Sequence, residues 1–216
     1  MGVFTATPLE FVRSRHESDD VHTFFFRPLR ALSFKAGQHG LLAIPGAGRK
    51  PFSLASAPED EHVAIGTRVR AGSAYKTALA ALSPGTQVSL RGPLLDFTVA
   101  PSMARVVLLA QGIGITPFRS ILRHLSHVAG DTRATLVHVA TANHPYRDET
   151  AALATLGHYP TEQEEFAVRV KESIVEDPTA TYFVSGGSAF VTTTTAVLKA
   201  GGIRRAQIKK DRFLGY

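Results

Sequence analysis

The sequence predicts an all-β part over residues 1–100 followed by an α/β part with a parallel sheet over residues 101–216. Three observations support this division. Before residue 100, short apolar runs alternate with turns that contain Gly and Pro, as in small barrels and sandwiches. From Arg105 onward, strand-like runs alternate with helical patterns, which favours a doubly wound parallel sheet. A glycine-containing turn at residues 111–117 joins the first of these runs to a helical pattern. We place the boundary near Pro101-Ser102.

In the first part, residues 8–15 and 21–27 are expected strands, joined by the polar residues 17–20. The other expected strands cover residues 41–44, 52–55, 62–69, 86–90 and 97–100. Residues 74–82 have a helical pattern, which Ser83-Pro84-Gly85 brings to an end.

In the second part, the expected strands cover residues 105–110, 135–140, 166–170, 181–185 and 206–209. The expected helices cover residues 117–127, 148–156 and 189–199. Residues 192–195 are four consecutive threonines, which form helices poorly. The last helix therefore depends on the burial of its apolar side chains, such as Phe190 and Leu198.

The turn at residues 111–117 has the sequence QGIGITP and carries the first functional signal. Thr116 is expected to cap the following helix, and Pro117 suits its first position. Gly112 and Gly114 permit a sharp turn and let a phosphate approach the N–H groups at the helix start. The alternative is an ordinary connection with two convenient glycines, because such a motif is weak when it stands alone.

Composition limits the possible functions. The chain has 216 residues, no Cys and a formal net charge of +6. Without Cys there is no disulfide, thiolate nucleophile or Cys-ligated iron–sulfur cluster. The positive charge favours acidic partners, but the basic residues are dispersed, so we expect no nucleic-acid binding. No apolar run approaches the length of a membrane span and no export signal is present, so we expect a cytoplasmic protein.

Five motifs occur in the order in which they stand in the ferredoxin–NADP reductase family, which the chain resembles over nearly its whole length. They are RKPFSLASAP at residues 49–58, GSAYK at 72–76, GPLLDF at 92–97, GIGITP at 112–117 and DRFLGY at 211–216. The resemblance implies a six-stranded antiparallel barrel that holds FAD, followed by a parallel-sheet domain that binds NADPH or NADH.

The family pattern R-x-Y/F-S-x-x-S aligns with Lys50, Phe52, Ser53 and Ser56. Phe52 is then expected to pack on the flavin. Lys50 stands where the family has a phosphate-binding arginine, so Arg49 beside it is an alternative ligand. A helix start near Gly72 is expected to hold the flavin pyrophosphate, unless it is a plain helix end. The implied flavin contacts are Arg49, Lys50, Pro51, Phe52, Ser53, Ser56, Thr67, Arg68, Gly72, Ser73, Tyr75, Lys76, Thr77, Phe213 and Tyr216.

The motif at residues 112–117 matches the pattern G-x-G-x-T-P, which binds the pyrophosphate of the nicotinamide nucleotide in the family. Ser185 stands where relatives place a Cys, Ala or Ser beside the nicotinamide ring. Residues 141–144 contain no Arg, so we expect modest selectivity between NADH and NADPH. The implied nucleotide contacts are Gly112, Gly114, Thr116, Pro117, Thr141, Asn143, Arg147, Ser185, Gly186 and Gly187.

The implied reaction is hydride transfer from the nicotinamide to the flavin, with the protein orienting the two rings. Catalytic roles are assigned to Ser53, Thr116, Ser185 and Tyr216. Ser53 places a hydroxyl near the reactive flavin nitrogen. Tyr216 or Phe213 covers one face of the flavin, unless Tyr216 only fills a gap between the domains. Asp211 is either a polar partner at this site or a surface charge.

The chain departs from the family pattern at several positions. Leu95 replaces a glycine, which costs energy if that position requires a positive φ, and Gly187 replaces a proline. Residues 170–181 look too short to include a crossover helix. The histidines at positions 124, 127, 138 and 144 match no zinc motif, so we expect no metal site and interpret them as surface or capping residues.

The sequence therefore predicts a monomeric FAD-dependent NAD(P)H reductase that passes electrons to a separate acidic acceptor such as ferredoxin or flavodoxin. One alternative is an NAD(P)H:flavin reductase that uses free flavin as a substrate. Another is a flavin-binding electron-transfer subunit of a larger complex.

Overall fold

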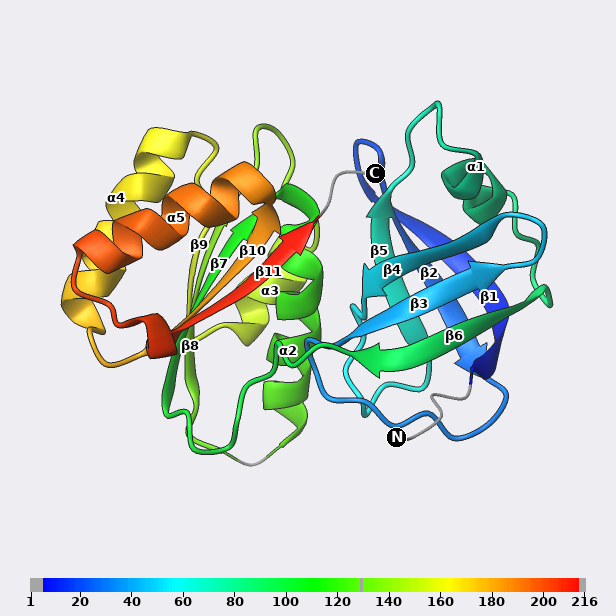
Figure 1. Cartoon of the computed structure of the whole chain (residues 1–216), viewed down its shortest axis with the longest axis horizontal. Coiled ribbons are helices and arrows are strands. Elements are labelled where there is room, and N and C mark those ends of the chain that lie inside the picture. Colours follow the sequence, from blue (N-terminus) through cyan, green and yellow to red (C-terminus); the bar gives the residue numbers. More distant parts are fainter. Residues whose placement is uncertain (1–5, 129, 214–216) are drawn as a thin grey trace.

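The structure of the chain, a computed structural model, describes residues 6–128 and 130–213 and contains two β-sheets (Figure 1). The first sheet is antiparallel, with the strand order β4-β3-β6-β1-β2-β5. Its strands are β1 (Thr7–Ser18), β2 (Val21–Pro28), β3 (His39–Ile44), β4 (Gly48–Ser53), β5 (Val63–Arg68) and β6 (Gln87–Leu94). The sheet curls around a core that includes the neighbouring rings of Phe11, Phe24 and Phe26. Helix α1 (Ala74–Ala80) packs Tyr75 and Leu79 into the same core.

The second sheet is parallel, with the strand order β11-β10-β7-β8-β9. Its strands are β7 (Arg105–Gln111), β8 (Arg133–Val139), β9 (Leu156–His158), β10 (Thr181–Gly187) and β11 (Ile208–Phe213). Helices α4 (Gln163–Glu176) and α5 (Ser188–Ala200) cover one face, and α2 (Thr116–His127) and α3 (Arg147–Leu153) cover the face toward the curled sheet (Figure 1). Two short 3-10 helices, η1 (Gly112–Ile115) and η2 (Arg205–Gln207), precede α2 and β11. The predicted fold class, a six-stranded antiparallel barrel followed by a parallel α/β sheet, is confirmed, with the six antiparallel strands forming a curled sheet.

Two expected strands are wrong. Residues 166–170 lie inside α4, so the crossover helix that the sequence was expected to lack is present. Phe166 and Val170 are four residues apart and face the core together, while Glu164 and Glu165 stabilise the positive end of the helix. Residues 97–100 form no strand, because Phe97 instead packs between the rings of Phe118 and Phe183 at 5.8 and 5.2 Å.

Several boundaries also differ from expectation. The strand expected at residues 52–55 ends at Ser53 and begins already at Gly48, because it pairs with β3 through a tight hairpin. The helix expected at residues 148–156 ends at Leu153, so Leu156 belongs to the short strand β9. The last strand of the curled sheet, β6, ends at Leu94, and the next strand, β7, begins at Arg105. The assignment of domains 1–100 and 101–216 stays a prediction.

Helix α2 fixes the two sheets relative to each other. Arg119 is buried in this helix and donates to the Ala55 carbonyl at 2.7 Å and to both carboxylate oxygens of Glu149. Arg123 joins Glu149 to Asp60 of the first part. Burial alone would raise the pKa of Asp60, but its hydrogen bond from Arg123 lowers that pKa. This network joins α2 to Ala55 and Asp60 of the first part.

In the described part of the chain, every helix is too short or too polar to cross a lipid bilayer.

Candidate flavin and nucleotide site

A cavity of about 340 Å³ lies where the two sheets meet. The curled sheet contributes β3, β4, β5 and helix α1, and the parallel sheet contributes η1, the start of α2 and the end of β11. Its lining residues are His39, Pro51, Phe52, Ser53, Gly66, Thr67, Arg68, Lys76, Leu95, Ile113, Thr116, Asp211, Arg212 and Phe213. The cavity thus joins segments that lie far apart in the sequence.

Many of the residues predicted to contact the flavin or to act in catalysis line this cavity. They are Pro51, Phe52, Ser53, Thr67, Arg68, Lys76, Thr116 and Phe213. Their roles toward a flavin stay predictions. Tyr216, to which we assigned the covering ring, lies outside the described residues.

Lys76 brings a buried positive charge into the cavity. Its ammonium lies 4.8 Å from the centre of the Phe52 ring and donates a hydrogen bond to the Thr67 hydroxyl. Burial, and then the nearby charge of Lys50, lower the pKa of Lys76 to about 8. Within the described residues, Lys76 forms no ion pair with a carboxylate. A buried cation without a carboxylate partner favours the binding of an anion.

A buried polar cluster closes one side of the cavity, and sequence reasoning missed most of it. The Nε2 atom of His39 lies 3.0 Å from the Ser53 hydroxyl and 3.2 Å from a carboxylate oxygen of Asp211. Ser185, which was expected beside the nicotinamide, is fully buried and donates to the other oxygen of Asp211 at 3.4 Å. Asp211 is therefore a polar partner inside the molecule, and the surface-charge alternative is wrong. A lone histidine before an apolar strand gives no sequence signal for such a contact.

Gly66 was also missed by the sequence analysis. A Cβ atom built there would lie 2.2 Å from the Tyr146 hydroxyl and 2.7 Å from the Thr116 methyl group. Tyr146 reaches this point from the start of α3, where its hydroxyl lies 2.7 Å from that of Thr23. A glycine is therefore required where β5 meets the second part of the chain.

The backbone at the glycine turn packs closely against β10, as its glycines permit, but the residue expected to cap α2 does not do so. Gly112 has a φ of +52°, and a Cβ atom on Gly114 would lie 2.3 Å from the Ser185 carbonyl oxygen. The prediction that Thr116 caps α2 is wrong. Thr116 is already helical, because η1 runs directly into α2, and its hydroxyl donates to the Ile113 carbonyl.

His138 of β8 hydrogen-bonds to this turn. It is fully buried, so its interpretation as a surface or capping histidine is wrong. Burial, and then the charge of His144, lower the pKa of His138 to about 3. The neutral ring can then donate from Nε2 to the Gly112 carbonyl at 2.8 Å. No group of His, Asp and Glu side chains in the described ranges is arranged to hold a metal ion.

At the start of α1, Lys76 lines the cavity and its neighbours in sequence do not. Gly72 forms the preceding turn with a φ of +90°, and the Ser73 hydroxyl caps the helix. Tyr75 points into the core and donates to the Leu42 carbonyl, and Thr77 bonds back to the Ser73 carbonyl. These residues shape the helix that carries Lys76 rather than line the cavity.

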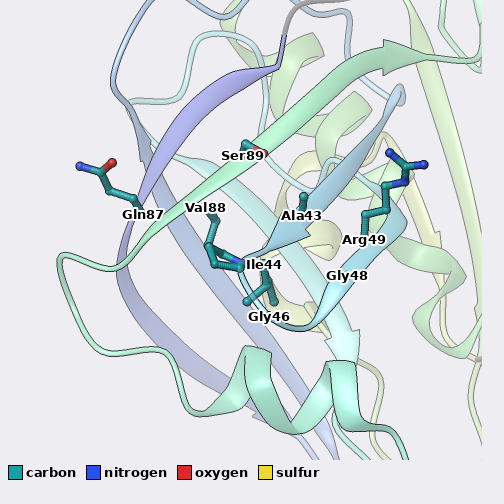
Figure 2. A pocket seen from close by; sticks show the side chains of 9 residues that line it. Ala43, Ile44, Gly46, Gly48, Arg49, Gln87, Val88 and Ser89 are labelled. Atoms are coloured by element: carbon teal, nitrogen blue, oxygen red, sulfur yellow. The ribbon is translucent and has the colours of Figure 1, made fainter.

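Two residues of the first motif also lie elsewhere. Arg49 lines an open groove of about 640 Å³ outside the curled sheet, formed by the β3–β4 hairpin and β6 (Figure 2). Figure 2 shows Arg49 and Gln87 on opposite sides of this groove. Ser56 is buried at the contact with α2, where its hydroxyl accepts from the Ala64 amide and its carbonyl accepts from Ser120. The structure does not bring either residue to the cavity.

The residues expected at the far end of the nucleotide lie in a separate groove. Asn143 and Arg147 line this groove opposite the β1–β2 turn, and Asn143 donates to Asp19 at 3.0 Å. The Arg147 guanidinium lies 5.5 Å from the centre of the Tyr159 ring. Thr141 is exposed at the end of β8. Their roles toward a nucleotide stay predictions.

Comparisons with known proteins agree with this geometry. No model of a known protein family matches the sequence. A flavohemoprotein of Deinococcus radiodurans is 27% identical over 157 residues, covering 68% of this chain and 39% of that protein. Ferredoxin–NADP reductase B of Sorangium cellulosum is 36% identical over 136 residues, covering 58% of this chain and 54% of that protein. The chain thus spans well under two thirds of the length of these relatives.

Among solved structures, the ferredoxin reductase in carbazole 1,9a-dioxygenase has a TM-score of 0.83 and 17% sequence identity, covering 97% of this chain and 70% of that one. This likeness extends over both sheets. Sequence relatives and structural neighbours of this chain thus include ferredoxin reductases.

Proposed function

We propose that the chain binds FAD in the cavity between its two sheets and acts as an NAD(P)H-dependent reductase that passes electrons to a separate acceptor. The observation that supports this most strongly is the buried Lys76 ammonium beside Phe52 and Ser53. A ligand with an anionic group, an aromatic ring and a hydrogen-bond acceptor would find a partner for each of them in this one cavity. FAD carries all three.

Bound FAD supplies the chemistry, because it accepts a hydride and can release the electrons one at a time. The chain's own residues bind and orient. Lys76 and Thr67 would hold the flavin phosphates, Phe52 would pack against the ring system, and the Ser53 hydroxyl would hydrogen-bond to a ring nitrogen. The apolar part of the wall would keep water away from the reacting rings.

The nicotinamide nucleotide is proposed to bind where η1 meets the ends of β7 and β10. The close packing of Gly114 against Ser185 leaves the N–H groups of η1 at the carboxyl edge of the parallel sheet. Ligands bind at this edge in doubly wound folds, and N–H groups at a helix start attract phosphate. In this proposal, residues 1–100 supply most of the flavin contacts and residues 101–216 bind the nucleotide.

The acceptor is proposed to be an acidic electron-transfer protein such as ferredoxin or flavodoxin. One relative is named as a ferredoxin–NADP reductase, and the formal net charge of this chain is +6. A positively charged reductase attracts an acidic partner and speeds their encounter at low salt. A cytoplasmic location and a monomeric state belong to the same proposal.

The test combines binding and turnover. The purified protein is mixed with FAD, FMN or riboflavin, and each dissociation constant is measured by flavin fluorescence. NADH or NADPH oxidation is then followed with ferricyanide as a one-electron acceptor. We expect FAD to bind tightest and to support turnover. Turnover with weakly held flavin would indicate a flavin reductase, bound flavin without turnover would indicate an electron-transfer subunit, and absence of flavin binding would refute the proposal.

A further inference from the structure

His39 forms a contact between the two sheets inside the candidate flavin site. It begins β3 and stands directly across from Ser53 in the β3–β4 ladder. Asp211 approaches the same imidazole from β11 of the other sheet. The side chains of His39 and Asp211 are 9% and 3% exposed, so water does not separate them from each other.

The chemistry of the three groups determines where the protons lie. The Asp211 carboxylate only accepts hydrogen bonds, and it lies 3.2 Å from Nε2 of His39. Nε2 must therefore carry a proton. The same N–H lies 3.0 Å from the Ser53 oxygen, which acts as an acceptor in this arrangement. Nδ1 of His39 is buried without a partner among the described residues, which suits an unprotonated nitrogen better than a second N–H.

The proton of the Ser53 hydroxyl is then left for another acceptor. A hydroxyl has one hydrogen, and His39 does not receive it because Nε2 is already protonated. Ser53 lines the cavity, so this hydrogen can point toward a ligand there. The arrangement converts a freely rotating hydroxyl into a directed donor.

We propose that His39, held by Asp211, is a positioning residue that directs the Ser53 hydroxyl proton into the cavity, toward a ring nitrogen of the flavin. This rests on the proposed FAD binding. His39 acts through Ser53. Its contribution is to remove the alternative rotamers in which Ser53 donates to a protein group.

Three variants test this role. His39→Phe keeps a ring but removes the donor, His39→Gln keeps an N–H donor near the position of Nε2, and Ser53→Ala removes the hydroxyl. Each is loaded with FAD, and the visible flavin spectrum, the flavin midpoint potential and the anaerobic rate of flavin reduction by NADH are measured. His62→Phe is the control, because His62 lies outside the cavity lining and faces Glu61.

We expect His39→Phe to slow flavin reduction by about tenfold, as for loss of other residues that orient a reacting group. Its spectrum and midpoint potential should change in the same direction as those of Ser53→Ala. The double variant should be no slower than Ser53→Ala, because both changes remove one interaction. His39→Gln should recover most of the rate, and His62→Phe should match the parent protein.

A measurement on the parent protein keeps the proposal testable even if His39→Phe fails to fold. In ¹⁵N-histidine NMR, the shift of His39 Nε2 should be that of a protonated nitrogen. A proton on Nδ1 alone would overturn the proposal, as would multiplicative effects of the His39 and Ser53 variants. If the parent binds no FAD, the proposed function fails. If the parent binds FAD and is reduced while His39→Phe is unchanged, this inference alone fails.

Discussion

Replacing Lys76 by Met should make the protein without flavin more stable and its binding of FAD weaker. Folding lowers the pKa of Lys76 from 10.5 to about 8, mainly through burial, and its ammonium has a hydroxyl partner rather than a carboxylate. At about 1.36 kcal/mol for each pKa unit, holding this charge in the cavity costs roughly 3 kcal/mol. Met has a similar length and no charge, so the variant avoids that cost.

The effect on FAD has the opposite sign. A hydrogen bond between a cation and a phosphate in a site of low polarity contributes roughly 1.5–3 kcal/mol. The dissociation constant for FAD should therefore rise by about one to two orders of magnitude in Lys76→Met. Arg49→Met is the matched control, because Arg49 lines the outer groove and should leave FAD affinity unchanged.

The pH dependence provides an independent check. Between about pH 8 and pH 10.5, the unfolded chain binds a proton on Lys76 that the folded chain has lost. The stability of the parent protein should therefore rise with pH across this window relative to Lys76→Met, and the difference between them should shrink. FAD affinity of the parent should fall as pH rises above about 8, because the empty site loses its cation.

Urea denaturation without flavin measures the stabilities, and quenching of flavin fluorescence measures the dissociation constants. The reasoning is refuted if Lys76→Met is less stable than the parent at pH 7 and binds FAD equally well. Weaker FAD binding in Arg49→Met than in Lys76→Met would instead place the phosphate at the outer groove.

Three further predictions concern the glycine turn, Leu95 and nucleotide selectivity. Gly114→Ala should lower the free energy of unfolding by roughly 1–3 kcal/mol and weaken NADH binding, because its Cβ would lie 2.3 Å from the Ser185 carbonyl. Gly130→Ala, with nothing within 4 Å, is the control, and equal losses in both would contradict the account. Leu95 has a φ of 63° and is 65% exposed. Leu95→Gly should therefore raise the free energy of unfolding, measured by urea denaturation, by about 1 kcal/mol. A lower free energy of unfolding in this variant would show that the Leu95 side chain makes stabilising contacts. Steady-state kinetics should show modest selectivity between NADH and NADPH, because Arg147 already stacks on Tyr159. A strong NADPH preference that Arg147→Ala abolishes would disprove this.

The sequence predicted the order of strands and helices well where a hydrophobic pattern extended over many residues and turn residues stood at its ends. Residues 105–127, a buried strand, a glycine turn and an amphipathic helix, are the clearest example. It failed at residues 166–170, where two apolar side chains on one face of a helix resemble a short strand. It failed again at Phe97, whose burial depends on rings from α2 and β10 rather than on its own neighbours in sequence.

The candidate site shows the same limit. Phe52 and Ser53 were identified from the motif at residues 49–58, and Lys76 from the motif at residues 72–76. His39 was not identified, because its contact with Asp211 joins residues that lie far apart in the sequence. Arg49 was expected at the cavity as a neighbour of Lys50, but alternate residues of a strand point to opposite faces, and Arg49 faces outward.

An anaerobic titration of the FAD-loaded protein with NADH and with NADPH tests the central claim most directly. The visible absorbance of the flavin is followed as each nucleotide is added, and air is then admitted. The account predicts that stoichiometric nucleotide bleaches the flavin band, that air restores it, and that the FAD remains with the protein after gel filtration. A flavin band that persists with excess NADH and NADPH, or FAD that separates from the protein before any nucleotide is added, would contradict the account.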